Sequence, residues 1–266
     1  MVSCSREFSA QPSTWRHIFN KVLLVTGGSR GIGAATALMA AQQGWAVAVN
    51  YASRSDAAEH VVQEIAGQGG QAIAVQADIA NEAEVLSMFE QVHARLGPLC
   101  GLVNNAGVVD LAARVDEMSL ARWRRMIDIN IIGSFLCARE AVRRMSTRHG
   151  GQGGVIVNLS SVAAVLGAPG QYVDYAATKG AIDTFTVGLA REVASEGIRV
   201  NGVRPGLIDT EIHASGGQPE RAWQLAGSIP MKRPGTAQEI ASAIVWLLSE
   251  QASYTTGSLL DVTGGR

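Results

Sequence analysis

Short apolar runs alternate with helical patterns along most of the chain. Seven of these runs are rich in valine, leucine and isoleucine: "KVLLVTGG", "AVAVNY", "AIAVQADI", "GLVNNAG", "GVIVNLSS", "IRVNGVRPG" and "SLLDVTGG". A continuous apolar run only a few residues long is typical of a strand that is buried on both faces of a parallel sheet. The pattern therefore predicts seven buried strands.

Segments with helical periodicity lie between these strands, at residues 33–43, 56–67, 82–96, 119–148, 175–195 and 237–249. Strands separated by helices of this length indicate a parallel sheet that is covered by helices on both faces. No linker or change in composition divides the chain. We therefore expect an α/β fold, with one doubly wound Rossmann-type domain over residues 21–266. Residues 1–20 are expected to form a polar tail outside that domain.

Polar and glycine-rich segments follow the predicted strands, namely "TGGSRGIG", "NYASRS", "ADI", "NNAG", "NLSS" and "RPG". In doubly wound sheets a ligand binds beyond the carboxyl ends of the strands, where the strand order reverses. The coincidence of so many signals at strand ends predicts a ligand site along that edge of the sheet.

The segment "TGGSRGIG" joins the first strand to the first helix. Gly27 can turn the chain sharply, Gly31 lets the backbone approach a pyrophosphate, and Gly33 lets the helix pack closely on the strand. The helix N-terminus then offers unpaired N–H groups to phosphate. Glycine-rich turns are common, but the order strand, loop, helix favours a nucleotide site.

The end of the second strand, "VAVNYASRS", bears on the choice of nucleotide. An NAD site usually presents Asp or Glu there to accept from the ribose 2′-hydroxyl, whereas Asn50 stands here and Arg54 follows. A guanidinium binds a 2′-phosphate, and Arg30 in the glycine loop could reach the same group. The sequence favours NADP (NADPH), with NAD possible; the alternative is that both arginines are solvated loop residues.

Composition excludes several other classes. Of 266 residues, 17% are charged and the formal net charge is −1, so no basic field suggests a nucleic acid partner. Cys4, Cys100 and Cys137 form no CxxC pair or disulfide framework, which favours a reducing cytoplasmic location. No apolar run is long enough to span a membrane, and residues 1–20 do not resemble a secretory signal. The histidines and cysteines lack metal-ligand spacing, and no GxSxG motif surrounds the serines, so neither a metal nor a hydrolase is expected.

The segment "DYAATKGAID" places Tyr175 and Lys179 four residues apart. On a helix this spacing brings the two Cβ atoms within about 5–6 Å. A tyrosine pKa is about 10, and a neighbouring ammonium can lower it by roughly 1–3 units, as would the positive charge of an oxidised nicotinamide. We therefore expect a phenol that exchanges protons near neutral pH; an ordinary amphipathic surface helix is the alternative.

Five motifs, "TGGSRGIG", "NNAG", the "SS" after the fifth strand, "YAATK" and "RPGLIDT", occur in an order and spacing that resemble the short-chain dehydrogenase/reductase family. The resemblance implies that Tyr175 is the catalytic acid or base, that Lys179 tunes it and holds the nicotinamide ribose, and that Ser161 binds the substrate oxygen. It also implies that Asn130 holds a water in a proton relay; a buried asparagine satisfied by backbone is the alternative. The family's usual spacing falls on Val162, so the choice between Ser160 and Ser161 stays open, whereas Tyr172 has no lysine partner.

The resemblance also implies a set of residues around the nucleotide. Asp78 would meet the adenine ring, and Thr210 would contact the nicotinamide carboxamide, beside a turn shaped by Pro205 and Gly206. The full set expected at the cofactor is Gly27, Ser29, Arg30, Gly31, Ile32, Asn50, Ser53, Arg54, Asp78, Ile79, Asn105, Ala106, Gly107, Tyr175, Lys179, Pro205, Gly206, Ile208 and Thr210.

By the same resemblance, the chain is expected to interconvert a ketone or aldehyde and an alcohol, preferably with NADPH. Reductases of 3-oxoacyl thioesters and dehydrogenases of sugars and steroids are the nearest in kind. The alternatives are a non-catalytic NADP-binding regulator and an NAD-dependent sugar or steroid alcohol dehydrogenase. We expect a small-molecule substrate whose identity depends on the segment after Thr210, acting as a mobile lid, and a homotetramer or homodimer. The arginines of "ARWRRMIDIN" and "REAVRRMSTRH" are interpreted as a solvated or subunit-facing surface, with an acidic carrier protein as the alternative partner.

Overall fold

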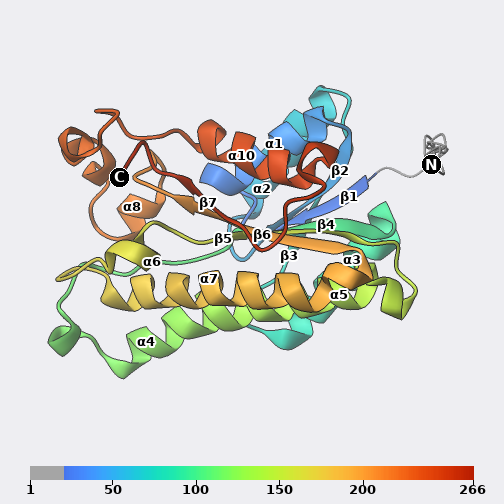
Figure 1. Cartoon of the computed structure of the whole chain (residues 1–266). Coiled ribbons are helices and arrows are strands. Elements are labelled where there is room, and N and C mark those ends of the chain that lie inside the picture. The colour runs from blue at the N-terminus through green and yellow to red at the C-terminus, as the bar shows by residue number, and fades with distance from the viewer. Residues whose placement is uncertain (1–20) are drawn as a thin grey trace, which may run out of the picture.

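The computed structural model describes residues 21–266 and contains a single sheet of seven parallel strands between two layers of helices (Figure 1). The expectation for residues 1–20 lies outside the described residues. The strands are β1 (Lys21–Val25), β2 (Trp45–Tyr51), β3 (Ala72–Gln76), β4 (Leu99–Asn104), β5 (Gly154–Leu159), β6 (Ile198–Pro205) and β7 (Leu259–Val262). All seven strands predicted from the apolar runs are present, which confirms the predicted fold class.

The α-helices are α1 (Gly31–Gln42), α2 (Ser55–Gly67), α3 (Glu82–Leu96), α4 (Leu120–Ile127), α5 (Ser134–Met145), α6 (Ala163–Leu166), α7 (Val173–Val193), α8 (Ile212–Ser215), α9 (Arg221–Gln224) and α10 (Ala237–Leu248). Helices α1, α2 and α10 cover one face of the sheet, and α3, α5 and α7 cover the other (Figure 1). None of the helices within residues 21–266 is long and apolar enough to cross a membrane.

Successive side chains of β1 pack alternately against the two layers of helices. Val22 and Leu24 belong to the hydrophobic core beneath α3, α5 and α7, whereas Leu23 and Val25 belong to the core beneath α1, α2 and α10. Successive side chains of a strand point to opposite faces, so an uninterrupted apolar strand supplies both cores at once. This is why β1 reads as an apolar run without a polar interruption from Val22 to Val25.

The helix expected over residues 119–148 is present as one unbroken helical stretch from Leu120 to Met145, but its middle turn is π-helical, which was not expected. Ser119 caps α4 through a bond from the Arg122 N–H, the chain then forms a π-helical segment at Asp128–Gly133, and α5 follows. Within this segment, a Cβ at Gly133 would lie 2.7 Å from the side chain of Ile79, so glycine lets the widened turn pack against the chain after β3. The extra residue per turn of a π-segment cannot be read from hydrophobic periodicity alone.

The strand order is β3-β2-β1-β4-β5-β6-β7, so the direction of winding reverses between β1 and β4. A doubly wound sheet leaves its ligand crevice at this point, outside the carboxyl ends of the strands. The segments after β1, β2, β4, β5 and β6 meet at this edge, where two neighbouring cavities lie.

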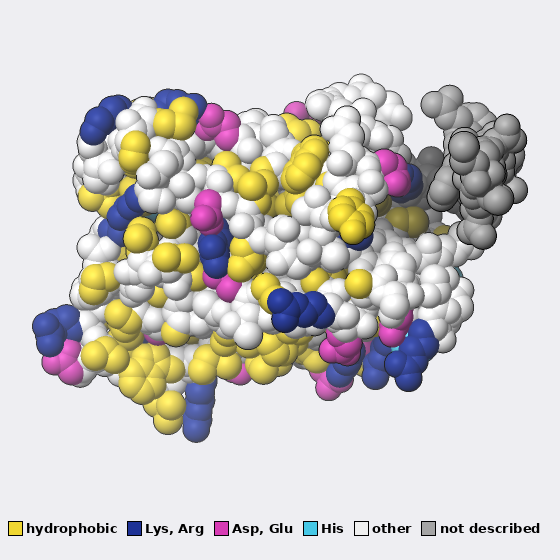
Figure 2. Space-filling view, viewed as in Figure 1, with side chains coloured by type: hydrophobic (Ala, Val, Ile, Leu, Met, Phe, Trp, Pro, Cys, Tyr) yellow, Lys and Arg dark blue, Asp and Glu magenta, His cyan; other side chains and the backbone are white. Residues whose placement is uncertain are grey.

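One face of the molecule is rich in exposed apolar side chains. Figure 2 shows them along the edge where Figure 1 places α4 and α7. They include Leu120, Ile127, Ile132 and Phe135, and the ring of Phe135 stacks on that of Phe185 with centroids 3.9 Å apart.

Candidate active site

The glycine-rich loop after β1 adopts the backbone that its glycines were expected to provide. Gly27 and Gly31 have φ values of 59° and 53°, a region that favours glycine. A Cβ at Gly33 would lie 2.4 Å from the carbonyl oxygen of Gly27 and 2.5 Å from Nδ2 of Asn105. The third glycine is therefore required by close packing of α1 on the loop.

Side chains from the end of β4 hold this loop. Asn105 Nδ2 donates to the carbonyl oxygens of Thr26 and Gly27, at 2.9 and 3.0 Å. In return, Thr26 Oγ1 accepts from the backbone N–H groups of Asn105 and Ala106. The first and fourth strand ends are thus locked together at the point where the strand order reverses.

The N-terminus of α1 has no side-chain cap, whereas Asn81 caps α3 and Thr236 caps α10. Its first-turn N–H groups face a cavity of about 490 Å³. A helix N-terminus with free N–H groups and glycines that admit close approach fits a pyrophosphate. Most of the residues predicted at the cofactor line this cavity: Gly27, Ser29, Arg30, Gly31, Ile32, Asn50, Ser53, Arg54, Asp78, Ile79, Asn105, Ala106, Gly107 and Thr210.

Asn50, at the end of β2, lines the nucleotide cavity and also holds neighbouring segments together. Its Oδ1 accepts from the N–H of Gly27 at 3.1 Å, and its Nδ2 donates to the carbonyl of Ala77 at 3.0 Å. The side chain is 2% exposed and joins the glycine loop, β2 and the end of β3. It leaves this corner of the cavity without a carboxylate at the strand end.

Two arginines lie at the same corner. Arg54 pairs with Asp56 at 3.4 Å, and Arg30 pairs with Glu211 at 3.2 Å. All four side chains are about half exposed or more. Exposed pairs of this kind are weak, so either guanidinium can turn to another anion at little cost.

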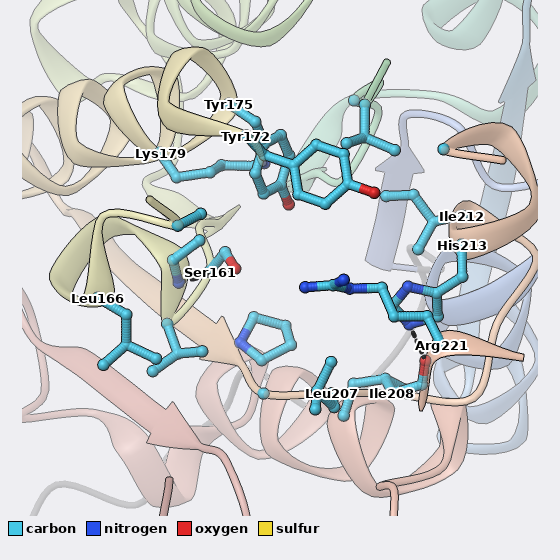
Figure 3. Close-up of a pocket in the computed structure, with 18 of the residues that line it drawn as sticks. Ser161, Leu166, Tyr172, Tyr175, Lys179, Leu207, Ile208, Ile212, His213 and Arg221 are labelled. Atoms are coloured by element: carbon cyan, nitrogen blue, oxygen red, sulfur yellow. Dashed lines mark hydrogen bonds between the residues drawn. The ribbon is translucent and has the colours of Figure 1, made fainter. Parts of the chain in front are cut away.

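A second cavity, of about 410 Å³, contains the predicted catalytic residues (Figure 3). Tyr175 and Lys179 reach it from α7, and Ser161 from the segment after β5. Ser161 lines the cavity near enough to Tyr175 to lower the pKa of the phenol, whereas the hydroxyl of Ser160 donates to the carbonyl of Lys179 at 3.1 Å. Of the two serines left open by the sequence, Ser161 is the one that contacts Tyr175. Pro205, Gly206 and Ile208, the remaining residues expected at the cofactor, line this cavity as well.

The pKa values of the pair differ from the expectation. Burial raises the pKa of Tyr175 to about 12, partly opposed by the hydrogen bond from Ser161. Burial lowers the pKa of Lys179 to about 8, partly opposed by the charge of Asp183. The expected lowering of the Tyr175 pKa by its lysine neighbour was therefore wrong in direction. Spacing along a helix shows proximity but not desolvation, which disfavours the charged form of both groups.

The orientation of Lys179 explains part of this result. Its ammonium donates to the carbonyl of Leu159 at 2.6 Å and lies 5.6 Å from the centroid of the Tyr175 ring. The Lys179 nitrogen also lies close to Gly107, since a Cβ built on Gly107 would be 3.6 Å from it. The lysine thus sits between the phenol and the edge of the nucleotide cavity.

Asn130 lies in the π-helical segment and is 1% exposed. Its Oδ1 accepts from the N–H of Val108 at 2.8 Å, and its Nδ2 donates to the carbonyl of Val108 at 3.0 Å. The side chain is therefore satisfied by backbone, as in the alternative weighed from the sequence. It nevertheless borders Gly107, which also adjoins Lys179, so the proton-relay role stays a prediction.

Sequence reasoning missed a buried ion pair that fixes the start of α7. Arg122 donates to Asp174 through two bonds, of 2.6 and 3.1 Å, and both side chains are at most 10% exposed. Asp174 also accepts from the N–H of Tyr175. The pair therefore connects α4 to the residue before Tyr175, and it corrects the interpretation of Arg122 as a solvated surface arginine.

The arginines on α5 lie at the surface, as expected, and share one buried carboxylate. Arg139, Arg143 and Arg144 surround Glu140, whose side chain is 3% exposed. Hydrogen bonds from Arg144 and Arg139 hold the pKa of Glu140 below its usual value against the opposing effect of burial. The three arginines remain 21–57% exposed around this buried carboxylate, so they form a paired surface network, and the i, i+4 pattern of Glu140 and Arg144 was the signal available in the sequence.

The segment after Thr210 forms the far wall of the second cavity through α8 and α9 (Figure 3). His213 bonds to the carbonyl of Ile208 at 2.9 Å, and burial lowers its pKa below the usual value. Tyr172 and Arg221 face the same space, with the guanidinium carbon of Arg221 5.2 Å from the centroid of the Tyr172 ring. No spacing in the sequence pointed to these residues, because separate loops bring them together.

Comparison with known proteins decides the family. A family model described as enoyl-(acyl carrier protein) reductase matches residues 27–266. The chain belongs to the short-chain dehydrogenase/reductase family. Curated members of this family that resemble the chain are named oxidoreductases and reductases, and the chain is an oxidoreductase of this family.

Relatives of this short-chain dehydrogenase/reductase match almost end to end. Uncharacterized oxidoreductase YgfF of Escherichia coli (strain K12) is 55% identical over 245 residues, which is 92% of this chain and 99% of the relative. The 3-oxoacyl-[acyl-carrier-protein] reductase FabG of Staphylococcus epidermidis is 40% identical over 248 residues, or 92% of this chain and 98% of the relative.

Among solved structures, the 3-ketoacyl-(acyl-carrier-protein) reductase from Brucella melitensis complexed with NADH has a TM-score of 0.86 and 32% identity. The match covers 94% of this chain and 99% of that one. Use of a pyridine nucleotide is typical of short-chain dehydrogenase/reductases, and the glycine loop and uncapped α1 of this member fit such a group.

Proposed function

We propose that this short-chain dehydrogenase/reductase is a carbonyl reductase that prefers NADPH, with Tyr175 as the proton donor. The observation that carries the proposal is the continuity of the two cavities. Five residues line both of them: Ile32, Asn105, Gly107, Thr210 and Ile212. A nucleotide with its pyrophosphate at α1 would therefore extend toward Tyr175.

The state of Tyr175 supports the reducing direction. With a pKa of about 12, the phenol carries its proton at neutral pH and can donate it to a carbonyl oxygen. Ser161, in the same cavity, can hold that oxygen against the phenol and stabilise the negative charge that develops. When the reduced nucleotide is bound, its nicotinamide supplies the hydride. General acid assistance of this kind is typically worth about 10²–10⁴-fold.

Lys179 has a complementary task. Its pKa of about 8 leaves it largely protonated at neutral pH, so it places a positive charge beside a phenol that becomes negative as it gives up its proton. Its position near Gly107 also suits a contact with ribose hydroxyls.

The preference for NADPH rests on the corner at the end of β2. Arg30 and Arg54 both line the nucleotide cavity there, while Asn50 replaces the acidic residue that would accept from a free 2′-hydroxyl. A 2′-phosphate would gain two guanidinium partners and meet no carboxylate from the strand end.

The relatives named as 3-oxoacyl carrier-protein reductases suggest a ketone as the reducible group. One residue speaks against a carrier protein as partner. Glu196 stands where such reductases often have a basic residue, and it accepts a hydrogen bond from Ser146 at 2.5 Å. Its side chain is only 17% exposed and lies 3.9 Å from Arg148, so it weighs only slightly against an acidic carrier.

The experiment is a screen of the purified protein with NADPH at neutral pH, following loss of nicotinamide absorbance. Oxoacyl thioesters, sugars, quinones and small ketones form the panel, and NADH replaces NADPH in parallel. Oxidation that depends on a carbonyl compound and is faster with NADPH supports the proposal. Tight NADPH binding with no turnover of any compound rejects it in favour of a regulator.

We further propose that the apolar face on α4, α5 and α7 pairs with a second copy of the chain, in a homodimer or homotetramer. The exposed Leu120, Ile127 and Phe135 would be buried there. Light scattering of the wild-type protein and of a Phe135→Glu variant tests this, because a charge at the centre of such an interface shifts the mass toward the monomer. The cytoplasmic location stays a prediction from the sequence.

A further inference from the structure

We infer that Arg221 is a specificity residue of the substrate cavity and that the enzyme takes a small carbonyl compound that carries a carboxylate. This inference rests on the proposed function, because it names the substrate class of the same site. It depends on how Arg221 is held, on its charge, and on what it faces.

Arg221 begins α9 and is fixed by neutral partners. Its Nη2 donates to Oε1 of Gln171 at 2.6 Å, and its Nη1 donates to Oε1 of Gln218 at 3.0 Å. Its guanidinium carbon lies 5.2 Å from the centroid of the Tyr172 ring, a stacked position that a guanidinium favours. These contacts set the direction of the side chain without neutralising it.

Within residues 21–266, Arg221 forms no ion pair, whereas the part-buried Arg122 and Arg204 each have a carboxylate partner. The nearby acids are directed elsewhere. Glu220 is exposed, and the carboxylate of Asp209 accepts from the indole N–H of Trp223 at 3.0 Å. Partial burial of an unpaired guanidinium costs desolvation free energy, and a bound anion would offset that cost.

The guanidinium of Arg221 lies in the substrate cavity and keeps donors that no side chain uses. A guanidinium has five N–H donors in one plane, of which the two glutamines use two. Figure 3 shows the guanidinium projecting from α9 into the middle of the cavity, toward the side that holds Ser161. A molecule whose carbonyl oxygen meets Ser161 and Tyr175 would therefore present its other end to Arg221.

A carboxylate fits this arrangement better than a phosphate. One fixed guanidinium balances one negative charge and can bind both oxygens of a carboxylate through parallel bonds. Arg266 lines the same cavity but is exposed, and nothing in the described residues fixes its direction. The rest of the wall, including Leu166, Leu207 and Ile212, is apolar and suits a short hydrocarbon link between the two groups.

The test compares oxo acids with their methyl esters, which keep the ketone and remove the charge. The probes are 3-oxobutanoate, 4-oxopentanoate and 5-oxohexanoate, so that the separation between ketone and carboxylate is varied. The wild-type enzyme should prefer the best acid over its ester by at least about tenfold in kcat/KM, since hydrogen bonds to a charged group are worth a factor of that order or more.

Arg221→Gln should bring this acid-to-ester ratio down to about one, mainly by raising KM for the acid. Arg221→Lys should leave an intermediate ratio, because lysine keeps the charge but cannot donate the two parallel hydrogen bonds of a guanidinium. The matched control is Arg191→Gln, which removes the same charge from an exposed position on α7. It should keep the wild-type ratio. An unchanged ratio in Arg221→Gln, or a higher kcat/KM for dihydroxyacetone phosphate than for any oxo acid, overturns the inference.

The two proposals fail in different ways. Reduction of neutral ketones with no preference for acids overturns the inference and leaves the reductase standing. If no carbonyl compound is reduced, the proposed function fails, and calorimetric titration with 4-oxopentanoate still decides whether the cavity binds a carboxylate. Heat of binding that is lost in Arg221→Gln and kept in Arg191→Gln supports the inference, and its absence in the wild-type protein overturns it.

Discussion

The ammonium of Lys179 donates a 2.6 Å hydrogen bond to the main-chain carbonyl of Leu159, at the end of β5. The same strand continues into Ser160 and Ser161, and Ser160 bonds back to the carbonyl of Lys179. The end of β5 and the second turn of α7 are therefore joined in both directions. This arrangement fixes the lysine beside Tyr175 without a direct bond between the two side chains.

A pH dependence follows from the two shifted pKa values. Reduction needs a protonated Tyr175, which holds below about pH 12, and a charged Lys179, which holds below about pH 8. The kcat/KM for carbonyl reduction should therefore be level up to neutral pH and fall as the pH rises through about 8. Alcohol oxidation needs the phenolate and should become faster as pH rises. Steady-state rates in both directions over about pH 6–10 would measure this.

Lys179→Arg is the informative variant for that profile. The guanidinium stays charged across the whole range, so whatever activity remains should no longer decline near pH 8. A wild-type reduction rate that is constant to about pH 10 would mean that the lysine charge does not assist the reaction.

Tyr175→Phe removes the proposed acid while keeping the ring in its buried position. The rate of reduction should drop by at least about 10²-fold, and the Kd for NADPH should change less than about threefold, because the phenol acts on the substrate. Tyr172→Phe serves as the control, since Tyr172 lies in the same cavity but its ring packs against Arg221 rather than Lys179. Turnover and fluorescence titration with NADPH separate the two effects. More than about a tenth of the wild-type rate in Tyr175→Phe is incompatible with the role proposed.

Much of the fold could be predicted because the central strands, such as β1, β2 and β4, are buried on both faces. The short apolar runs around Val22–Val25 and Val47–Val49 predicted buried strands. The glycine spacing after β1 predicted the order of the first strand, loop and helix. The long helix over residues 119–148 was predicted, but the π-helical segment in its middle, Asp128–Gly133, was not. Hydrophobic periodicity continues through a π-segment, and only its contacts with Ile79 and Val108 reveal it.

The site was predictable where function depends on local spacing and not where it depends on burial or on distant loops. Tyr175 and Lys179 lie on one helix, so their proximity followed from the sequence, but their desolvation by β5 and the segment after β6 did not. Arg221 meets Tyr172 and Gln171 across about fifty residues of chain. Asn50 was expected at the nucleotide, while its bonds to Gly27 and Ala77 show a structural task that strand position alone does not indicate.

The choice of nucleotide can be tested at Arg54. Arg54→Ala removes a guanidinium that needs only to leave an exposed 3.4 Å pair with Asp56 to reach a 2′-phosphate. NADPH binding should weaken by about tenfold, within the range for one hydrogen bond to a charged group, and NADH binding by less than about twofold. Arg95→Ala is the control, because Arg95 is an exposed arginine that bonds to the carbonyl of Ala74, away from the cavity. Equal losses for the two nucleotides would remove Arg54 from the phosphate site.

The packing of the glycine loop gives a prediction about stability. A methyl group at Gly33 would meet the carbonyl oxygen of Gly27 at 2.4 Å and Asn105 Nδ2 at 2.5 Å, and the first of these is backbone that cannot turn aside. Gly33→Ala should therefore lower the free energy of unfolding by about 2 kcal/mol or more, as overpacking commonly does, and weaken nucleotide binding as the loop is displaced. Gly67→Ala, at the end of α2 with nothing within 4 Å of the added carbon, should change stability by less than about 1 kcal/mol. Urea denaturation of the two variants measures both values. If Gly33→Ala were as stable as Gly67→Ala, the glycine loop and α1 could move apart without cost. Their close contact would then not determine the shape of the proposed pyrophosphate site.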